Sequence, residues 1–474
     1  MLTELHLGGF QGFAEEMVAD LAPITLIFGP NGSGKSSLLR GLRLLQQSVT
    51  SDSYSRESGR MIFEGDQVSL ASFANVAHKH KASEHVSLGL KIDVASQNQD
   101  RSSPLTNVVK EIEIDWLISN PGIVSMITLV IKLHRDLGEV TLMFRRDEGI
   151  LDLYLHKNAE LLEYYAEALS SVRNDDSRVT ANFDDFLELG PEGYLVSSND
   201  SPWTEVLTSC GFVLKGIFPA IGPRRREGVS AKQQRLVAEV LFFVRQSVRR
   251  HLELAEYVGP LRTIADRIKF DAADQPIMHE DSRATRDEVR SNQVISEWLS
   301  RLTSGRYEYR AVNYLPTEVE FLGHLRSELI VDKLTNTTVT FGDVGVGLSQ
   351  VLPILQVLNG ANRRAKLSQA PILIEQPELH LHPKMQADLM DLFVESVAAS
   401  PRIQVIAETH SEAMLLRLQK HLRRGTIRPE QVSVLYVDQI DQTNFVSNLP
   451  VLRSNDFEVS LPLSFSGLRL EDII

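Results

Sequence analysis

Apolar and polar positions along the chain follow two kinds of pattern, and these patterns predict its elements. The segment LTELHLGGF alternates at every second position, which predicts a strand, and PITLIF is a continuous apolar run typical of a buried strand. Between residues 86 and 155, further alternating runs are separated by the turn-like sequences RDLG and RDEG. We therefore expect an antiparallel sheet in this part of the chain.

Two later segments have the three- and four-residue spacing of amphipathic helices. The second, residues 291–305, ends in Ser-Gly, which is typical of a helix end. The first, residues 229–257, has its apolar positions at Val237, Leu241, Val244, Val248 and Leu252. These helices are expected to form a second lobe.

The last third of the chain alternates between helix and strand patterns. A turn and a helix are expected over residues 341–360, and strand and helix patterns then follow one another up to VSVLYVD. Such alternation predicts a parallel sheet covered by helices. The expected fold class is α/β, with the first strand and the last third as halves of one sheet, split by an antiparallel β lobe and a helical lobe. The expected segments are 1–85, 86–228, 229–340 and 341–474.

Composition and leader signals bound the cellular context. The single cysteine, Cys210, excludes an internal disulfide and fits a reducing compartment. The N-terminus has no basic region followed by an apolar run, so no signal peptide is expected. The longest apolar stretch, GIVSMITLVIKL, is too short to span a bilayer. We expect a cytoplasmic protein that is not a membrane component.

The charge of the chain bears on nucleic acid as a partner. A formal net charge of −13 argues against indiscriminate coating of DNA or RNA. Short basic clusters in GPRRREG, VRQSVRR and LRRG leave a local basic groove open. The alternative is that these clusters are solvated surface or pair within the molecule.

A glycine-rich motif, GPNGSGKS, lies between the buried strand PITLIF and an amphipathic helix. Its glycines let backbone N–H groups wrap phosphates, and the helix N-terminus adds partial positive charge. Lys35 is expected to reach the β and γ phosphates of ATP, and the Ser36 hydroxyl to bind Mg²⁺. The expected nucleotide-binding residues of this loop are Gly29, Asn31, Gly32, Ser33, Gly34, Lys35, Ser36 and Ser37.

Two further strand ends carry polar residues suited to a bound nucleotide. The strand ILIE ends in Glu375, an acid that we expect to organise the Mg²⁺ shell. The following strand ends before His410, which is placed to sense the γ-phosphate from the adjacent strand. The alternative for a lone histidine is a structural role at the surface or in the core.

These motifs together resemble those of the ABC-class ATPases of the RecF/SMC and overcoming-lysogenisation-defect type. The residues that carry the resemblance are the glycine-rich loop, DVGVGLSQ, the EQPELHLHP run and THS, within residues 1–48 and 341–438. The resemblance implies an ABC-type ATPase head, two of which sandwich two ATP molecules. It implies that a signature at Gly345, Gly347, Ser349 and Gln350 meets the γ-phosphate held by the partner head, and that His380 and His382 lie at the interface.

One residue departs from the pattern of that class. Gln376 stands where the class usually has a catalytic glutamate, and an amide can orient a water but cannot take its proton. Three possibilities follow: Gln376 orients the water and hydrolysis is slow, Glu378 handles the water, or the head is chiefly an ATP-gated clamp. We expect slow turnover.

Other histidine groups give no prediction of a metal site. His380 and His382 form an H-x-H pair with no obvious third ligand. His78, His80 and His85 are equally unsupported as ligands.

Several functions are compatible with these features. The leading hypothesis is an ATP-switched dimer or higher oligomer that senses or clamps DNA or RNA. It would control a partner effector, such as a nuclease or toxin from the same operon, in bacterial anti-phage defence. No C-terminal nuclease domain is expected, because the last predicted strand is followed closely by Ile474.

The alternatives are a RecF-like DNA repair or recombination ATPase, a transporter subunit, and a scaffold that binds ATP without hydrolysing it. The long insertion before Gly345 and the absence of a plain LSGGQ signature count against the transporter. Gln376 is the only support for the scaffold.

Overall fold

The structure is a computed structural model, and its described residues form two compact units. The first comprises Met1–Ala22, Gly29–Ala255 and Leu435–Asn448, and the second Pro23–Phe28, Glu256–Val434 and Leu449–Ile474. The described residues are 1–51, 59–81, 85–94, 109–134, 139–147, 150–156, 212–221, 231–262, 269–271, 286–314, 324–340, 343–365, 369–440 and 443–449. The four-segment division expected from the sequence stays a prediction.

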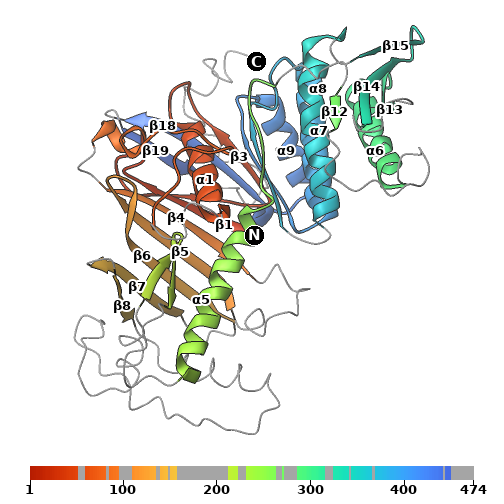
Figure 1. Cartoon of the computed structure of the whole chain (residues 1–474). Coiled ribbons are helices and arrows are strands. Elements are labelled where there is room, and N and C mark those ends of the chain that lie inside the picture. The colour runs from red at the N-terminus through yellow and green to blue at the C-terminus, as the bar shows by residue number, and fades with distance from the viewer. Residues whose placement is uncertain are drawn as a thin grey trace, which may run out of the picture. The chain divides into compact units, whose positions relative to one another are not determined.

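The first unit contains a nine-stranded antiparallel sheet with the strand order β10-β9-β8-β7-β6-β5-β4-β1-β2 (Figure 1). The antiparallel sheet predicted between residues 86 and 155 is confirmed, and β1 and β2 extend it. The RDLG turn lies outside the described residues, as does the second half of RDEG. The strands are β1 (Leu2–Gly8), β2 (Met17–Asp20), β4 (Val86–Asp93), β5 (Val109–Ser119), β6 (Ile123–Leu133), β7 (Glu139–Asp147), β8 (Ile150–His156), β9 (Phe212–Lys215) and β10 (Phe218–Ile221).

Alternation along these strands gives the sheet one apolar face. On β4 and β5 every second side chain is buried, as in Leu88, Leu90 and Ile92. Helix α1 (Lys35–Thr50) packs on β1 so closely that a Cβ on Gly41 would lie 2.8 Å from Leu7 Cδ2. The Gln46 side chain of α1 donates a hydrogen bond of 2.7 Å to the carbonyl of Ala255, just beyond α5 (Ala231–Leu252). The helix predicted over residues 229–257 is confirmed, although it is shorter.

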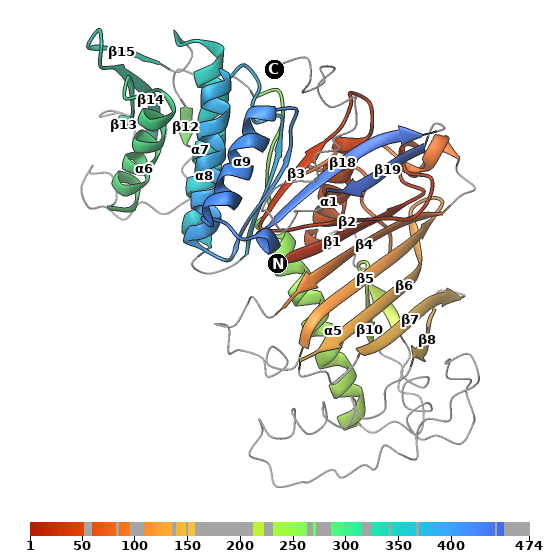
Figure 2. The ribbon, with the colours of Figure 1, turned by 180° about the vertical axis from the view of Figure 1, so that it is seen from behind.

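The second unit contains parallel strands in the order β11-β16-β17-β3 (Figure 2). Every residue of β3, β16 and β17 is buried, as expected for parallel strands covered on both faces. The predicted sharing of one sheet by the N-terminal part and the last third is confirmed for β3, whereas β1 belongs to the other sheet. The strands are β11 (Glu256–Val258), β16 (Ala370–Glu375), β17 (Ile403–Glu408) and β3 (Ile24–Phe28).

The helices of the second unit are α6 (Arg286–Leu302), α7 (Val346–Arg364), α8 (Pro383–Ala399) and α9 (Glu412–Arg424). Helix α9 begins after Ser411, whose hydroxyl accepts a hydrogen bond of 3.1 Å from the Met414 N–H. Arg417 of α9 pairs with Asp391 of α8 at 2.7 Å, which fixes the two helices side by side. These elements agree with the helix and strand alternation predicted for the last third.

The expected helical lobe is only partly helical. It contains α5 and α6, but residues 269–340 also form a small antiparallel sheet of β12 (Lys269–Asp271), β13 (Tyr307–Tyr314), β14 (His324–Asp332) and β15 (Thr337–Thr340). The alternation in YEYRAVNY and HLRSELIVD was the signal for these strands. A hairpin of β18 (Val432–Ile440) and β19 (Thr443–Asn448) follows, and β18 runs from the second unit into the first. No helix in the described residues is long and apolar enough to cross a bilayer.

Candidate nucleotide site

The loop that leads into α1 has the backbone of a phosphate cradle. Gly29, Gly32 and Gly34 have φ values of 148°, 80° and 94°, which a residue with a side chain adopts only under strain. A Cβ on Gly29 would overlap the carbonyl oxygen of Val437, and one on Gly34 would overlap the side-chain amide of Asn444. No atom lies within 4 Å of the Cβ position of Gly32, so the loop is open there.

Lys35 and Ser33 give the cradle its polar groups. The Lys35 ammonium donates hydrogen bonds to the carbonyls of Gly29 at 3.1 Å and Pro30 at 2.8 Å, so the side chain folds back over the loop. The Ser33 hydroxyl is buried and has no hydrogen-bond partner in the described part of the chain. An unpartnered buried hydroxyl costs free energy, and a phosphate oxygen would satisfy it. These residues therefore fit a bound triphosphate.

The other expected residues of the loop lie beside this cradle. Asn31 is exposed, Ser36 is half-buried in the first turn of α1, and Ser37 is buried. The Ser37 N–H donates to the Gly34 carbonyl at 2.9 Å, which closes the first helical turn. The structure thus brings all eight predicted loop residues together in the first unit.

In the second unit, the carboxyl ends of three parallel strands meet at one edge. Glu375 at the end of β16 is in register with Glu408 of β17, which is in register with Ile27 of β3. The chain leaves this edge from β3 directly into the glycine-rich loop. Glu375 is nearly buried, and its Oε1 accepts a hydrogen bond of 2.9 Å from the Tyr257 hydroxyl. A carboxylate here is the ligand type that Mg²⁺ prefers.

The turn after β16 holds the two candidates for handling water. Gln376 has a φ of 47°, and its N–H donates to the Glu408 carbonyl at 2.8 Å. Glu378 accepts one hydrogen bond from the Thr409 hydroxyl and one from the His410 N–H, both at 2.7 Å. Glu378 therefore ties the turn after β16 to the end of β17. The His410 side chain is exposed at the same edge.

Arg262 is a residue of this edge that the sequence did not reveal. Its guanidinium is buried and donates to the carbonyls of Glu375 at 2.8 Å, Gln376 at 3.0 Å and Gln350 at 3.1 Å. Burial lowers the pKa of Arg262 to about 10, although the charges of Glu378 and Tyr257 act in the opposite direction. It remains charged at neutral pH. Its only clue in the sequence is its place just after the short strand EYV, and no motif marks it.

The predicted signature divides into an exposed and a buried part. Gly345 precedes α7, and no atom lies within 4 Å of its Cβ position. A Cβ on Gly347 would lie 2.6 Å from the carbonyl oxygen of His380, so the helix start packs directly on that loop. Ser349 is buried and its hydroxyl donates to the Val346 carbonyl at 2.8 Å, and Gln350 is buried as well. The glycines, rather than Ser349 and Gln350, form the open end of the helix.

The remaining histidines have structural contacts. His382 precedes α8, and its Nδ1 accepts a hydrogen bond of 3.3 Å from the Lys384 N–H. His380 is exposed and has a positive φ of 61°. The Nδ1 atoms of His78, His80 and His85 lie within 2.9 Å of the Gln11 carbonyl, the Ala74 carbonyl and the Ser119 hydroxyl, respectively.

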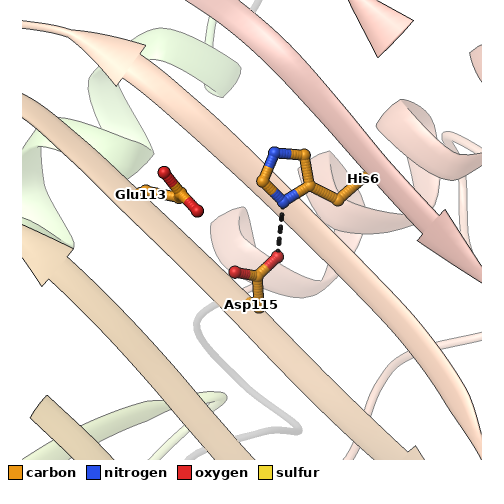
Figure 3. Close-up of side chains that lie close together, drawn as sticks. All are labelled: His6, Glu113 and Asp115. Carbon is orange, nitrogen blue, oxygen red and sulfur yellow. Dashed lines mark hydrogen bonds and ion pairs between the residues drawn. The ribbon is translucent and has the colours of Figure 1, made fainter. Parts of the chain in front are cut away.

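A second polar cluster lies on the nine-stranded sheet, away from the expected motifs. His6, Gly89 and Asp115 are in register on β1, β4 and β5. A Cβ on Gly89 would overlap the Asp115 carboxylate, so the glycine lets His6 and Asp115 meet above the middle strand. Figure 3 shows His6 Nδ1 facing Asp115 Oδ1, at a distance of 2.7 Å, with Glu113 beside them.

The charges of this cluster are balanced by two basic side chains. Lys91 contacts Glu4 at 2.6 Å and is in register with Glu113. Burial lowers the pKa of His6, but the hydrogen bond and charge of Asp115 outweigh it and leave the pKa raised. His6, Glu113 and Asp115 are residue types that bind metals, yet these contacts already describe an ion-pair network. We assign it no metal.

Comparisons with known proteins agree with the loop and strand-edge geometry. Residues 4–153 match the family model of an AAA domain, and residues 267–415 match that of an AAA ATPase domain. No curated protein sequence matches the chain.

Similar solved structures include three SMC head domains. A head bound to the C-winged helix domain of ScpA has 14% identity and a TM-score of 0.43, with 96% of this chain and 98% of that one covered. A head with an extended coiled coil, bound to the C-terminal domain of ScpA derived from Pyrococcus furiosus, has 13% identity and a TM-score of 0.44, with 95% and 96% covered. The head from Thermotoga maritima has 10% identity and a TM-score of 0.37, with 95% and 99% covered.

The sequence resemblance is confirmed at the level of the family models. The chain carries AAA-type ATPase domains on either side of residues 154–266, consistent with an ABC-class P-loop ATPase of the RecF/SMC kind.

Proposed function

We propose that the chain binds ATP with Mg²⁺, hydrolyses it slowly and uses the bound state as a switch. The observation that carries the proposal is the loop before α1. It combines an open turn at Gly32, a buried Ser33 hydroxyl without a partner among the described residues, and a folded-back Lys35. Phosphate oxygens would satisfy the hydroxyl and draw the ammonium away from the loop carbonyls.

Ser36 and Glu375 are the residues that would hold Mg²⁺, through a hydroxyl and a carboxylate oxygen. The bound ion would neutralise charge on the phosphates. Tyr257 orients Glu375 through the hydrogen bond to Oε1 and leaves its second oxygen for other contacts. The two residues come from the ends of α1 and β16 that the class uses for this purpose.

For the attacking water, the hydrogen bonds favour Gln376 over Glu378. Both oxygens of Glu378 already accept bonds, from Thr409 and His410. Its role in this proposal is to hold His410 at the strand edge, where the imidazole senses the γ-phosphate. Gln376 then orients the water without taking its proton, and turnover is slow.

We further propose that two chains close head to head around ATP. The N-terminal end of α7 has an open approach at Gly345 and no acidic residue in its first turn. A helix end of this kind attracts anions, and the chain already has one such end for its own nucleotide at α1. The open end of α7 therefore suits the γ-phosphate held by a second copy.

A slowly hydrolysing dimer suits a sensor or clamp better than a fast motor. A long-lived closed state gives time for a nucleic-acid signal to reach a partner effector, such as a nuclease or toxin encoded nearby. This is the role that the family resemblance implies for bacterial anti-phage defence.

The test combines turnover and mass for the native chain and for Lys35→Ala. We expect ATP with Mg²⁺ to double the mass of the native chain in solution and to give slow phosphate release, with neither effect in Lys35→Ala. Co-purification of the native operon products with and without ATP then identifies the effector. A native chain that binds no ATP contradicts the proposal as a whole, and one that binds ATP as a monomer contradicts the dimer.

A further inference from the structure

Arg262 is a buried cation whose guanidinium hydrogen bonds, among the described residues, all go to main-chain carbonyls. Its Nε donates to Gly259 at 3.0 Å, its Nη1 to Gln350, and its Nη2 to both Glu375 and Gln376. Burying a charge is costly unless it is well hydrogen-bonded, so a cation held by carbonyls indicates a demanding positional role. These carbonyls belong to three segments that are far apart in the sequence.

The link to α7 runs in both directions. The Gln350 side-chain amide donates a hydrogen bond of 2.8 Å to the Arg262 carbonyl, while Arg262 donates to the Gln350 carbonyl. The close approach of Gly347 to the His380 carbonyl is a second contact between the start of α7 and the loop after β16. A displacement of α7 cannot leave the Gln376 turn unaffected.

We propose that Arg262 is a positioning residue that couples the start of α7 to the Gln376 turn. This inference rests on the proposed function, in which α7 meets a nucleotide of the second copy and Gln376 orients the water. Engagement of α7 moves the Gln350 carbonyl, Arg262 follows it, and the Gln376 carbonyl moves with the same guanidinium. Closure of the dimer and alignment of the water then become one event.

The geometry requires arginine rather than another cation. Three nitrogens of one rigid plane donate to carbonyls in different directions, and the lysine ammonium is a single point on a flexible stem. Arg262→Lys therefore keeps the charge and loses the simultaneous contacts. A misplacement of about 1 Å near a reacting group costs about 10²-fold in rate.

The first experiment measures ATP affinity and kcat of Arg262→Lys. We expect kcat to fall about 10²-fold while the affinity for ATP stays within about twofold, since the residue does not contact the loop before α1. Arg301→Lys is the matched control, because Arg301 is an exposed arginine that pairs with Glu395, and its kcat should equal that of the parent. Added guanidinium ion should restore part of the rate of Arg262→Gly and leave the rate of Arg262→Lys unchanged.

The second experiment measures amide exchange without nucleotide, so it does not depend on hydrolysis. In Arg262→Lys we expect faster exchange in residues 345–351 and 376–381 together, with α9 unchanged. Unchanged exchange in both segments, or equal acceleration throughout the second unit, would overturn the coupling. So would a native kcat in Arg262→Lys. A native chain that does not hydrolyse ATP instead contradicts the proposed function, and the exchange result still decides whether Arg262 links the two segments.

Discussion

Glu378→Gln and Gln376→Glu separate the two residues that could handle the water. The Glu378 carboxylate makes two charge-assisted hydrogen bonds of 2.7 Å, each worth about 1.5–3 kcal/mol. After Glu378→Gln, the oxygen of the new amide can still accept from the His410 N–H, and its nitrogen can donate to the Thr409 hydroxyl. Two neutral bonds then replace two charged ones, so we expect a loss of about 1–3 kcal/mol of stability and an intact fold.

The kinetic consequence follows from the same contacts. If Glu378 only holds His410, Glu378→Gln should lower kcat by less than about tenfold, whereas loss of a general base costs about 10²–10⁴-fold. Gln376→Glu adds a group that can take the proton, so kcat should rise by up to about the same factor. Faster turnover shortens the closed state, and a switch of this kind should then signal less well.

The assay is steady-state phosphate release at saturating ATP and Mg²⁺, with ATP affinity and thermal unfolding measured for each variant. Glu395→Gln is the control, because Glu395 is an exposed carboxylate of the same unit. If Glu378→Gln stops hydrolysis and Gln376→Glu changes nothing, Glu378 is the base and its role as a tether is refuted. If both variants match the parent, neither residue handles the water.

Three further predictions concern other parts of the molecule. Lys35→Ala should weaken ATP binding about 100-fold in a fluorescent-nucleotide titration, because a charge-assisted phosphate contact is lost, and native affinity would disprove the site. Gly345→Asp should bind ATP yet form no ATP-dependent dimer by light scattering, whereas Gly345→Ala should dimerise, since neither Cβ meets an atom within 4 Å; a dimer of Gly345→Asp would show that this helix end does not meet a nucleotide. Because the folded-state pKa of His6 is raised, its pairing with Asp115 stabilises the fold fully below about pH 6.5 and less as pH rises through the folded pKa. The melting temperature of Asp115→Asn should therefore lie about 1–3 °C below that of the parent at about pH 6 and approach it at higher pH; a gap that does not change with pH would show that His6 is not the cause.

The sequence predicted the parts of the site that depend on local pattern. The loop from Gly29 to Lys35 is contiguous, so its glycines, lysine and following helix can be recognised together. The buried strands β3, β16 and β17 are continuous apolar runs, and their order of helix and strand predicts a parallel sheet. The edge that carries Glu375 follows from these two features.

Long-range contacts were outside the reach of such patterns. Arg262 contacts residues 88 and 113 positions away, and Tyr257 contacts a residue 118 positions away. Ser349 and Gln350 match a signature by sequence, yet tertiary contacts bury both side chains. The small sheet of β12 to β15 was overlooked although β13 and β14 alternate, because helical patterns on either side dominated the interpretation of residues 229–340.

Gly89 has a consequence for how this sequence can vary. Its missing side chain is the space in which the His6 and Asp115 side chains meet, so the three positions form one unit of inheritance rather than three independent ones. A relative with alanine or a larger residue at this position should also have a shorter or apolar residue at one of the other two. An alignment of relatives should show these three columns changing together, even though 83 and 26 positions separate the glycine from its two neighbours across the strands.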